Sequence, residues 1–194
     1  LYNTAITGSP VSIGYQHEVD YTFMRHGFGF TYPRPEALWG LTFSSYRGVF
    51  IYAPVLVAVL IAWFQDRSGR SLLFRDPVLV PSALLLLLIS SYAMWWGGWS
   101  FGPRHLIGAV ALLLYRGLSL LDGQRIGRGS FVLSALFGLV LSVSAISTVG
   151  SSFPTEIHEP LTERILPAVI AGQWSDAQLP LLLGWSVGTC TMLF

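Results

Sequence analysis

The part of this 194-residue sequence with the clearest capacity for chemistry is residues 95–105, WWGGWSFGPRH. Three glycines and a proline cannot continue a helix, so the backbone must turn sharply and hold several rings and one guanidinium close together. The Arg104 side chain is a planar, permanently charged donor that suits a phosphate group. The faces of Trp96 and Trp99 can stack against a sugar ring. The segment therefore predicts a clamp for a phosphorylated ligand.

A second cluster occupies residues 41–54, LTFSSYRGVFIYAP. We expect Arg47 at the end of a helix, with the hydroxyl groups of Ser44, Ser45 and Tyr46 around it. Pro54 should loosen that helix one or two turns further on. These residue types could hold an anion beside Arg104. The alternative is that Arg47 only anchors the end of the helix.

Other reactive side chains are less specific. Carboxylates that could act as a general base are Glu18, Asp20, Glu156, Glu159 and Glu163, although most exposed carboxylates are only solvated surface. The four histidines, at positions 17, 26, 105 and 158, lack a metal-ligand spacing, so no metal site is predicted. The single cysteine, Cys190, excludes a disulfide framework, a thiolate zinc site and an iron–sulfur cluster.

The elements that carry these residues are predicted to be membrane-spanning helices. The composition is 53% hydrophobic and only 11% charged, against about 25% charged residues in soluble domains. A bilayer core needs roughly 20 apolar residues of helix. Suitable runs cover about 48–64, 77–96, 105–121 and 131–149, and a shorter one covers 179–194. The predicted fold is all-α: a polytopic transmembrane bundle of four to five spans, in one domain over 1–194. We expect the chain to be a fragment of a longer protein.

The soluble alternative, in which these runs are buried core helices, leaves too little amphipathic sequence to cover them. The number and distribution of charged residues also exclude one class of function. Eleven basic residues, all arginine, balance ten acidic ones without a basic stripe, which argues against nucleic-acid binding.

The arginines predict which side of the membrane each loop faces. Cytoplasmic loops are enriched in basic residues. Two of the predicted connections between spans carry six arginines: Arg67, Arg70 and Arg75 in one, and Arg116, Arg125 and Arg128 around the other. We therefore predict that these two connections are cytoplasmic. The outer loop 1–47 and the outer segment 150–178 then face the extracytoplasmic side, with a short amphipathic helix expected around 161–169. The alternative for residues 95–105 is that they bind no ligand. They would then form a tight turn at the membrane surface, with interfacial tryptophans and an arginine that reaches the lipid headgroups.

The sequence resembles a known family at four places in order. The family is the bacterial polytopic glycosyltransferases of the GT-C class, related to the dolichyl-phosphate-mannose protein mannosyltransferases. The matching residues are Tyr2-Asn3 with Gly8-Ser9-Pro10 and Gly14-Tyr15; Phe43-Ser44 with Arg47-Gly48 and Tyr52-Ala53-Pro54; residues 95–104; and Glu159-Pro160-Leu161 with Leu166-Pro167 and Gly172. The third match is the most specific, and the resemblance spans most of the chain.

This resemblance implies a multi-pass enzyme of the bacterial inner membrane. It would transfer a sugar from a polyprenyl-phosphate donor to an acceptor glycan, lipid or protein on the extracytoplasmic face, without a cofactor. Arg104 and Arg47 would bind the donor phosphate. The residues expected to contact substrate are Trp96, Trp99, Tyr52, Tyr2, Asn3 and His105. The family's usual catalytic Asp has no counterpart in this chain, which resembles the later half of such enzymes. His105 and Ser45-Tyr46 depart from the family's pattern.

The mechanism that fits these residues is a displacement at the anomeric carbon, in which a fixed cation stabilises the negative charge that grows on the leaving phosphate. Two alternatives stay open: a non-enzymatic transporter or channel subunit, and an assembly subunit that only binds lipid headgroups. Transporters usually carry ionisable or broken positions at the bilayer midplane. The predicted spans carry only prolines near their ends, which favours a surface site.

Overall fold

The computed structural model describes residues 2–12, 17, 19–25, 27–65, 76–121, 128–149 and 155–174. Within these ranges every regular element is a helix, and the sole strand-like pairing is an isolated antiparallel bridge between Phe30 and Tyr92. The prediction of an all-α fold is confirmed. The fifth predicted span, 179–194, lies outside the described residues, as do Arg67, Arg70, Arg75, Arg125, Cys190, Glu18, His26 and the Gly14-Tyr15 pair.

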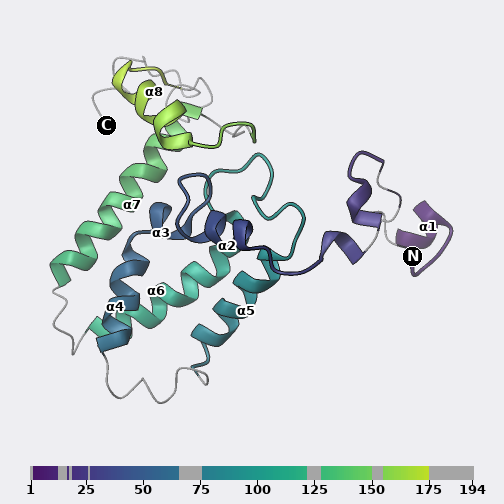
Figure 1. Cartoon of the computed structure of the whole chain (residues 1–194), viewed down its shortest axis with the longest axis horizontal. Coiled ribbons are helices and arrows are strands. Elements are labelled where there is room, and N and C mark those ends of the chain that lie inside the picture. The colour runs from purple at the N-terminus through teal and green to yellow at the C-terminus, as the bar shows by residue number, and fades with distance from the viewer. Residues whose placement is uncertain are drawn as a thin grey trace.

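Four helices form the body of the molecule. Helix α4 (Val55–Gln65) packs against both α6 (Ile107–Leu121) and α7 (Arg128–Val149), and α5 (Leu79–Ser90) packs against α6. In Figure 1 the C-terminal ends of α4 and α6 and the N-terminal ends of α5 and α7 lie in the lower part of the view. Consecutive helices therefore alternate in direction, which places the turns around 43–48 and 91–103 together at the opposite end.

The first predicted span, 48–64, is two helices rather than one. Helix α3 (Val49–Tyr52) ends at Tyr52, because the backbone of Ala53 leaves the helical region at φ −132° and ψ 65°, and α4 begins directly after Pro54. Proline lacks an N–H group and its ring collides with the preceding turn, so a break at this point follows from the sequence. The break turns Tyr52 toward the residues that precede α3.

The second span also differs from its prediction of 77–96. Helix α5 ends at Ser90, and residues 91–103 form a chain of turns that leads into the short 3-10 helix η5 (Arg104–Leu106) and then α6. Gly97 and Gly98 adopt φ values of 80° and 67°, a left-handed conformation that side chains with a Cβ rarely adopt. The glycines expected to turn the chain therefore do so, and the turn begins before the first tryptophan.

One helix in the described part of the chain is long and apolar enough to cross a membrane. It is Gly129–Val149 within α7: an 18-residue stretch of it has a mean hydropathy of 2.1, and 22% of that stretch is buried inside the protein. Helices α4, α5 and α6 have 11, 12 and 15 residues, or about 17–23 Å at 1.5 Å per residue. Each is shorter than a bilayer core of about 30 Å. The predicted number of four to five spans is therefore not confirmed.

Short elements cover the end of the bundle where the turns lie. Helix α2 (Pro35–Thr42) packs on α5, and a π-helix η6 (Leu161–Ile165) continues into α8 (Leu166–Ile170) over the end of α7. The predicted amphipathic helix near 161–169 is confirmed, since Ile165 and Ala168 are buried while Glu163 and Arg164 are exposed. The N-terminal elements α1 (Tyr2–Thr7), η2 (Thr22–Arg25) and η3 (Gly27–Gly29) lie to one side (Figure 1).

Candidate functional site

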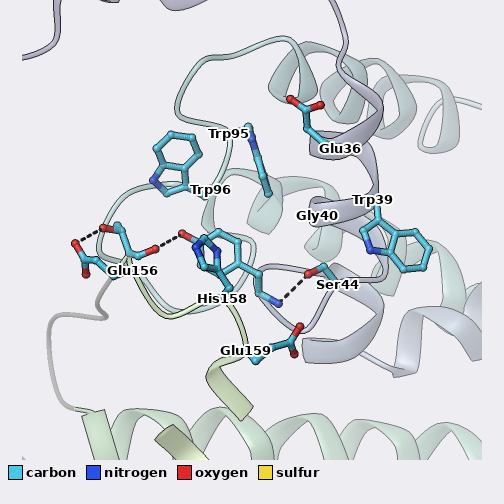
Figure 2. Close-up of a pocket in the computed structure, with 11 residues that line it drawn as sticks. Glu36, Trp39, Gly40, Ser44, Trp95, Trp96, Glu156, His158 and Glu159 are labelled. Carbon is cyan, nitrogen blue, oxygen red and sulfur yellow. Dashed lines mark hydrogen bonds between the residues drawn. The ribbon is translucent and has the colours of Figure 1, made fainter. Parts of the chain in front are cut away.

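A hollow of about 500 Å³ lies where α2, the 43–48 turn, the 91–103 turn and the segment 155–159 meet. We call it the tryptophan hollow. Figure 2 shows how the side chains from these four segments surround it. Its described lining residues are Glu36, Trp39, Gly40, Ser44, Tyr46, Trp95, Trp96, Thr155, Glu156, His158 and Glu159. They are chiefly aromatic rings, carboxylates and hydroxyl groups.

Arg47 lies behind this hollow and is fully buried, with a relative exposure of 0%. Its Nε donates to the Trp96 carbonyl at 2.9 Å, and its two terminal nitrogens donate to the carbonyls of Tyr46 at 3.1 Å and Gly98 at 3.2 Å. Because these carbonyls belong to two separate turns, the guanidinium fastens the 43–48 turn to the 91–103 turn. Burial lowers the pKa of Arg47, yet an arginine keeps its charge in a protein.

Tyr46 connects most parts of the hollow. Its ring lies 4.3 Å from the Arg47 guanidinium carbon and packs edge-on against Trp95, at 6.0 Å between ring centres. Its hydroxyl donates to the Thr155 carbonyl at 2.9 Å, and its ring centre lies 5.6 Å from that of His158. Burial raises the pKa of Tyr46, Arg47 opposes that rise, and Glu156 adds to it. The hydroxyl therefore stays protonated and keeps the 155–159 segment in place.

Two of the carboxylates are held by hydroxyl groups. The Ser45 hydroxyl donates to Glu159 Oε2, and the Tyr52 hydroxyl donates to the Ser45 carbonyl. Thr155 Oγ1 donates to Glu156 Oε1 at 3.0 Å. An ionised carboxylate has about four acceptor positions, so each of these groups retains capacity to accept hydrogen bonds from a ligand.

The wall formed by α2 depends on a glycine. A Cβ atom on Gly40 would lie 2.1 Å from the Trp95 ring, so no other residue fits while that ring keeps its place. Trp95 in turn packs edge-on against Trp96, with 5.9 Å between ring centres and 87° between ring planes. The two indoles thus form a corner of the hollow (Figure 2).

The structure separates most of the residues predicted to bind substrate. Trp96 lines the hollow, whereas Trp99 is 66% exposed and does not line it. Arg104 is exposed and makes no side-chain hydrogen bond or ion pair to the described residues. Arg47 and Arg104 therefore lie in different environments, and neither lines the hollow. Phosphate binding by Arg104 stays a prediction, whereas the guanidinium of Arg47 is buried and donates to backbone carbonyls.

The remaining predicted contacts lie elsewhere. Tyr52 is buried, packs edge-on against Phe101 at 4.6 Å between ring centres, and borders an apolar groove between α4, α6 and α7. His105 is half-buried with its ring edge-on to that of Tyr92. Tyr2 and Asn3 belong to α1, away from the helices that form the hollow (Figure 1), and Tyr2 is 78% exposed.

The sequence patterns do not identify several of the residues that line the hollow. Glu36 and Gly40 carry no motif signal, and only the packing of α2 against Trp95 places them at the hollow. The sequence identifies Glu156 and Glu159 as candidate carboxylates but indicates no site around them. The resemblance of Glu159-Pro160-Leu161 to the glycosyltransferase pattern is the feature of the sequence that points to this segment.

Chemically, the hollow offers aromatic faces and hydrogen-bond acceptors, which suit a polyhydroxylated ligand. Among the described residues, no group of three His, Cys, Asp or Glu side chains is placed to hold a metal ion. Comparison with known proteins found no matching family model, no matching curated protein and no matching solved structure.

Proposed function

We propose that this chain is part of an integral membrane glycosyltransferase. It transfers a sugar from a polyprenyl-phosphate donor to an acceptor on the extracytoplasmic face of the bacterial inner membrane. The observation that carries the proposal is the tryptophan hollow, which presents indole rings and carboxylates beside a turn that ends in an exposed arginine. Aromatic faces pack on sugar rings, carboxylates accept hydrogen bonds from hydroxyl groups, and arginine binds phosphate.

The exposure of apolar side chains supports the membrane part of the proposal. On α7 these side chains are 51–69% exposed: Val132, Leu133, Leu136, Phe137, Leu139, Val140 and Ile146. On α5 and α6, Leu84, Leu88, Leu112 and Leu118 are 47–60% exposed. So many exposed apolar side chains are unfavourable in water and are expected in contact with lipid or a partner. A polytopic bundle, with membrane lipids around it, is the arrangement that we propose.

The proposed mechanism gives separate roles to the two arginines. The exposed Arg104 binds the phosphate of the donor and stabilises the charge that develops on it as the bond to the anomeric carbon breaks. Arg47 holds the two turns together and so fixes the wall of the hollow. The acceptor hydroxyl forms the new bond to the anomeric carbon. Its proton passes to a carboxylate base, and we assign that role to no residue of this chain.

The test is sugar transfer in membranes that contain the complete protein. We expect Arg104→Ala to abolish transfer of radiolabelled sugar from a polyprenyl-phosphate donor, because the leaving phosphate loses its cation. Arg104→Lys should restore little, since an ammonium group cannot make a two-pronged contact. The matched control is Arg164→Ala, which removes another exposed arginine that does not line the hollow.

Transfer at near wild-type rates in both Arg104 variants would overturn the role of Arg104. Absence of transfer from the wild-type protein, with polyprenyl phosphate still bound, would instead favour a subunit that only binds lipid headgroups. Equal losses in the Arg104 and Arg164 variants would mean that the assay reports surface charge rather than a site.

A further inference from the structure

The tryptophan hollow is poorly suited to the phosphate group of a donor. Three carboxylates line it, those of Glu36, Glu156 and Glu159, and no arginine is among the described lining residues. Two arginines contact lining residues but are held by other groups. Arg34 pairs loosely with Glu36 at 4.0 Å and donates to the carbonyls of Tyr92 and Ala93. Arg47 lies against the Tyr46 ring. A phosphate in this hollow would face these carboxylates without a compensating arginine among the described lining residues, which costs free energy.

The same lining suits an uncharged sugar ring. The perpendicular indoles of Trp95 and Trp96 offer a corner of apolar surface for the C–H faces of a ring. The carboxylates of Glu156 and Glu159 are each oriented by one hydroxyl donor and retain free acceptor positions for ligand hydroxyls. The volume of about 500 Å³ falls within the roughly 300–1,000 Å³ of small-ligand sites.

We propose that the tryptophan hollow binds an uncharged saccharide ring, while the donor phosphate lies outside it at Arg104. This inference rests on the proposed function and narrows it, since the sugar held in the hollow carries no carboxylate or phosphate of its own. The saccharide belongs either to the lipid-linked donor or to the acceptor, and the same chemistry recognises both. His158, whose ring centre lies 5.6 Å from that of Tyr46, also lines the hollow and adds a further polar group to this surface.

Binding can be measured apart from transfer. The complete protein in nanodiscs is titrated with neutral methyl hexosides, a methyl hexuronide and inorganic phosphate, and binding is followed by saturation-transfer NMR. We expect millimolar binding of a neutral hexoside, with the hexuronide and phosphate at least tenfold weaker. Glu159→Gln should reduce that discrimination several-fold, because one repelling charge is removed. Glu163→Gln, an exposed carboxylate outside the hollow, should leave it unchanged.

The tryptophans provide a second matched pair. Trp96→Ala should weaken hexoside binding at least tenfold, whereas Trp99→Ala, which removes an exposed indole that does not line the hollow, should change it less than twofold. Tight binding of the hexuronide or phosphate would overturn the inference. So would equal effects of the two tryptophan variants.

Steady-state kinetics then show whether the bound saccharide belongs to the lipid-linked donor or to the acceptor. If the hollow holds the donor sugar, Trp96→Ala raises KM for the lipid-linked donor; if it holds the acceptor, the same change raises KM for the acceptor only. Transfer that proceeds with both KM values unaltered would defeat the inference and leave the proposed function intact. Hexoside binding by a protein that transfers no sugar would defeat the proposed function while supporting the saccharide site.

Discussion

Two arginines that look equivalent in the sequence have opposite surroundings in the structure. Arg47 is fully buried and donates to carbonyls in two turns, whereas Arg104 is exposed. Burying a guanidinium is unfavourable unless its donors are matched, so the position of Arg47 indicates a structural role. The sequence places both residues next to glycines and aromatic rings, and it contains no signal that separates them.

This contrast gives a prediction for Arg47. Arg47→Lys should lower the free energy of unfolding by about 2–4 kcal/mol, because one ammonium group cannot satisfy carbonyls on both turns. Denaturant unfolding in detergent, followed by tryptophan fluorescence, measures this change. Arg104→Ala should leave the free energy of unfolding within about 0.5 kcal/mol of the wild type, as is usual for exposed positions. A lysine variant as stable as the wild type would contradict the structural role of Arg47.

At the scale of elements, the hollow depends on how closely α2 approaches the 91–103 turn. Gly40→Ala would place a Cβ 2.1 Å from the present position of the Trp95 ring, so the ring must move out of the corner it forms with Trp96. We expect a loss of about 1–3 kcal/mol in unfolding free energy, with weaker hexoside binding. Gly108→Ala on α6 is the control, since nothing lies within 4 Å of its Cβ position. That change should be neutral or stabilising by up to about 1 kcal/mol.

A second element-scale prediction concerns the other end of the bundle. The buried Asp76 carboxylate accepts hydrogen bonds from the N–H groups of Val78 and Leu79 at 2.9 and 3.1 Å, and from Arg116 of α6 at 3.3 Å. Burial alone would raise the pKa of Asp76, but these donors outweigh it and lower the pKa. The native state therefore binds the proton less readily than the unfolded chain.

It follows that Asp76 stabilises the fold above about pH 4 and that this contribution is lost as the pH falls through the lowered pKa. Asp76→Asn should cost about 1–3 kcal/mol at neutral pH, and the difference from the wild type should shrink in acid. Unfolding measured from pH 7 to pH 3 tests both statements, with Glu163→Gln as an exposed control. A difference that grows as the pH falls would contradict this account.

Patterns among neighbouring residues predict the helices and turns better than they predict how these elements pack together. The run 131–149, the break at Pro54 and the turns at Gly97 and Gly98 follow from apolar length, a missing N–H and the freedom of glycine, all of which reside in neighbouring residues. The hollow combines four segments whose lining residues are separated by up to 123 residues, from Glu36 to Glu159. Contacts of this kind depend on packing, and nothing in the spacing of α2 indicates that Glu36 and Gly40 share a wall with Trp95.

At the scale of the whole molecule, the alternating helix directions predict which end of the proposed membrane protein faces outward. The 91–103 turn and α2, which both contribute residues to the tryptophan hollow, lie at one end of the bundle, and the C-terminal ends of α4 and α6 lie at the other (Figure 1). If the arginine-rich connections face the cytoplasm, the hollow faces outward. A cysteine introduced at either end therefore reports on orientation, once the native Cys190 has been replaced by serine.

In that background we expect Trp99→Cys to react with a membrane-impermeant maleimide in intact cells, because the position is exposed at the hollow end. Ser68→Cys, in the arginine-rich connection, should react only after the cells are permeabilised. Ala145→Cys, at a position with 1% exposure, should react only after denaturation and so controls for folding. Labelling of Ser68→Cys but not Trp99→Cys in intact cells would invert the topology. A lipid-linked donor displayed on the outer leaflet would then be unable to reach Arg104.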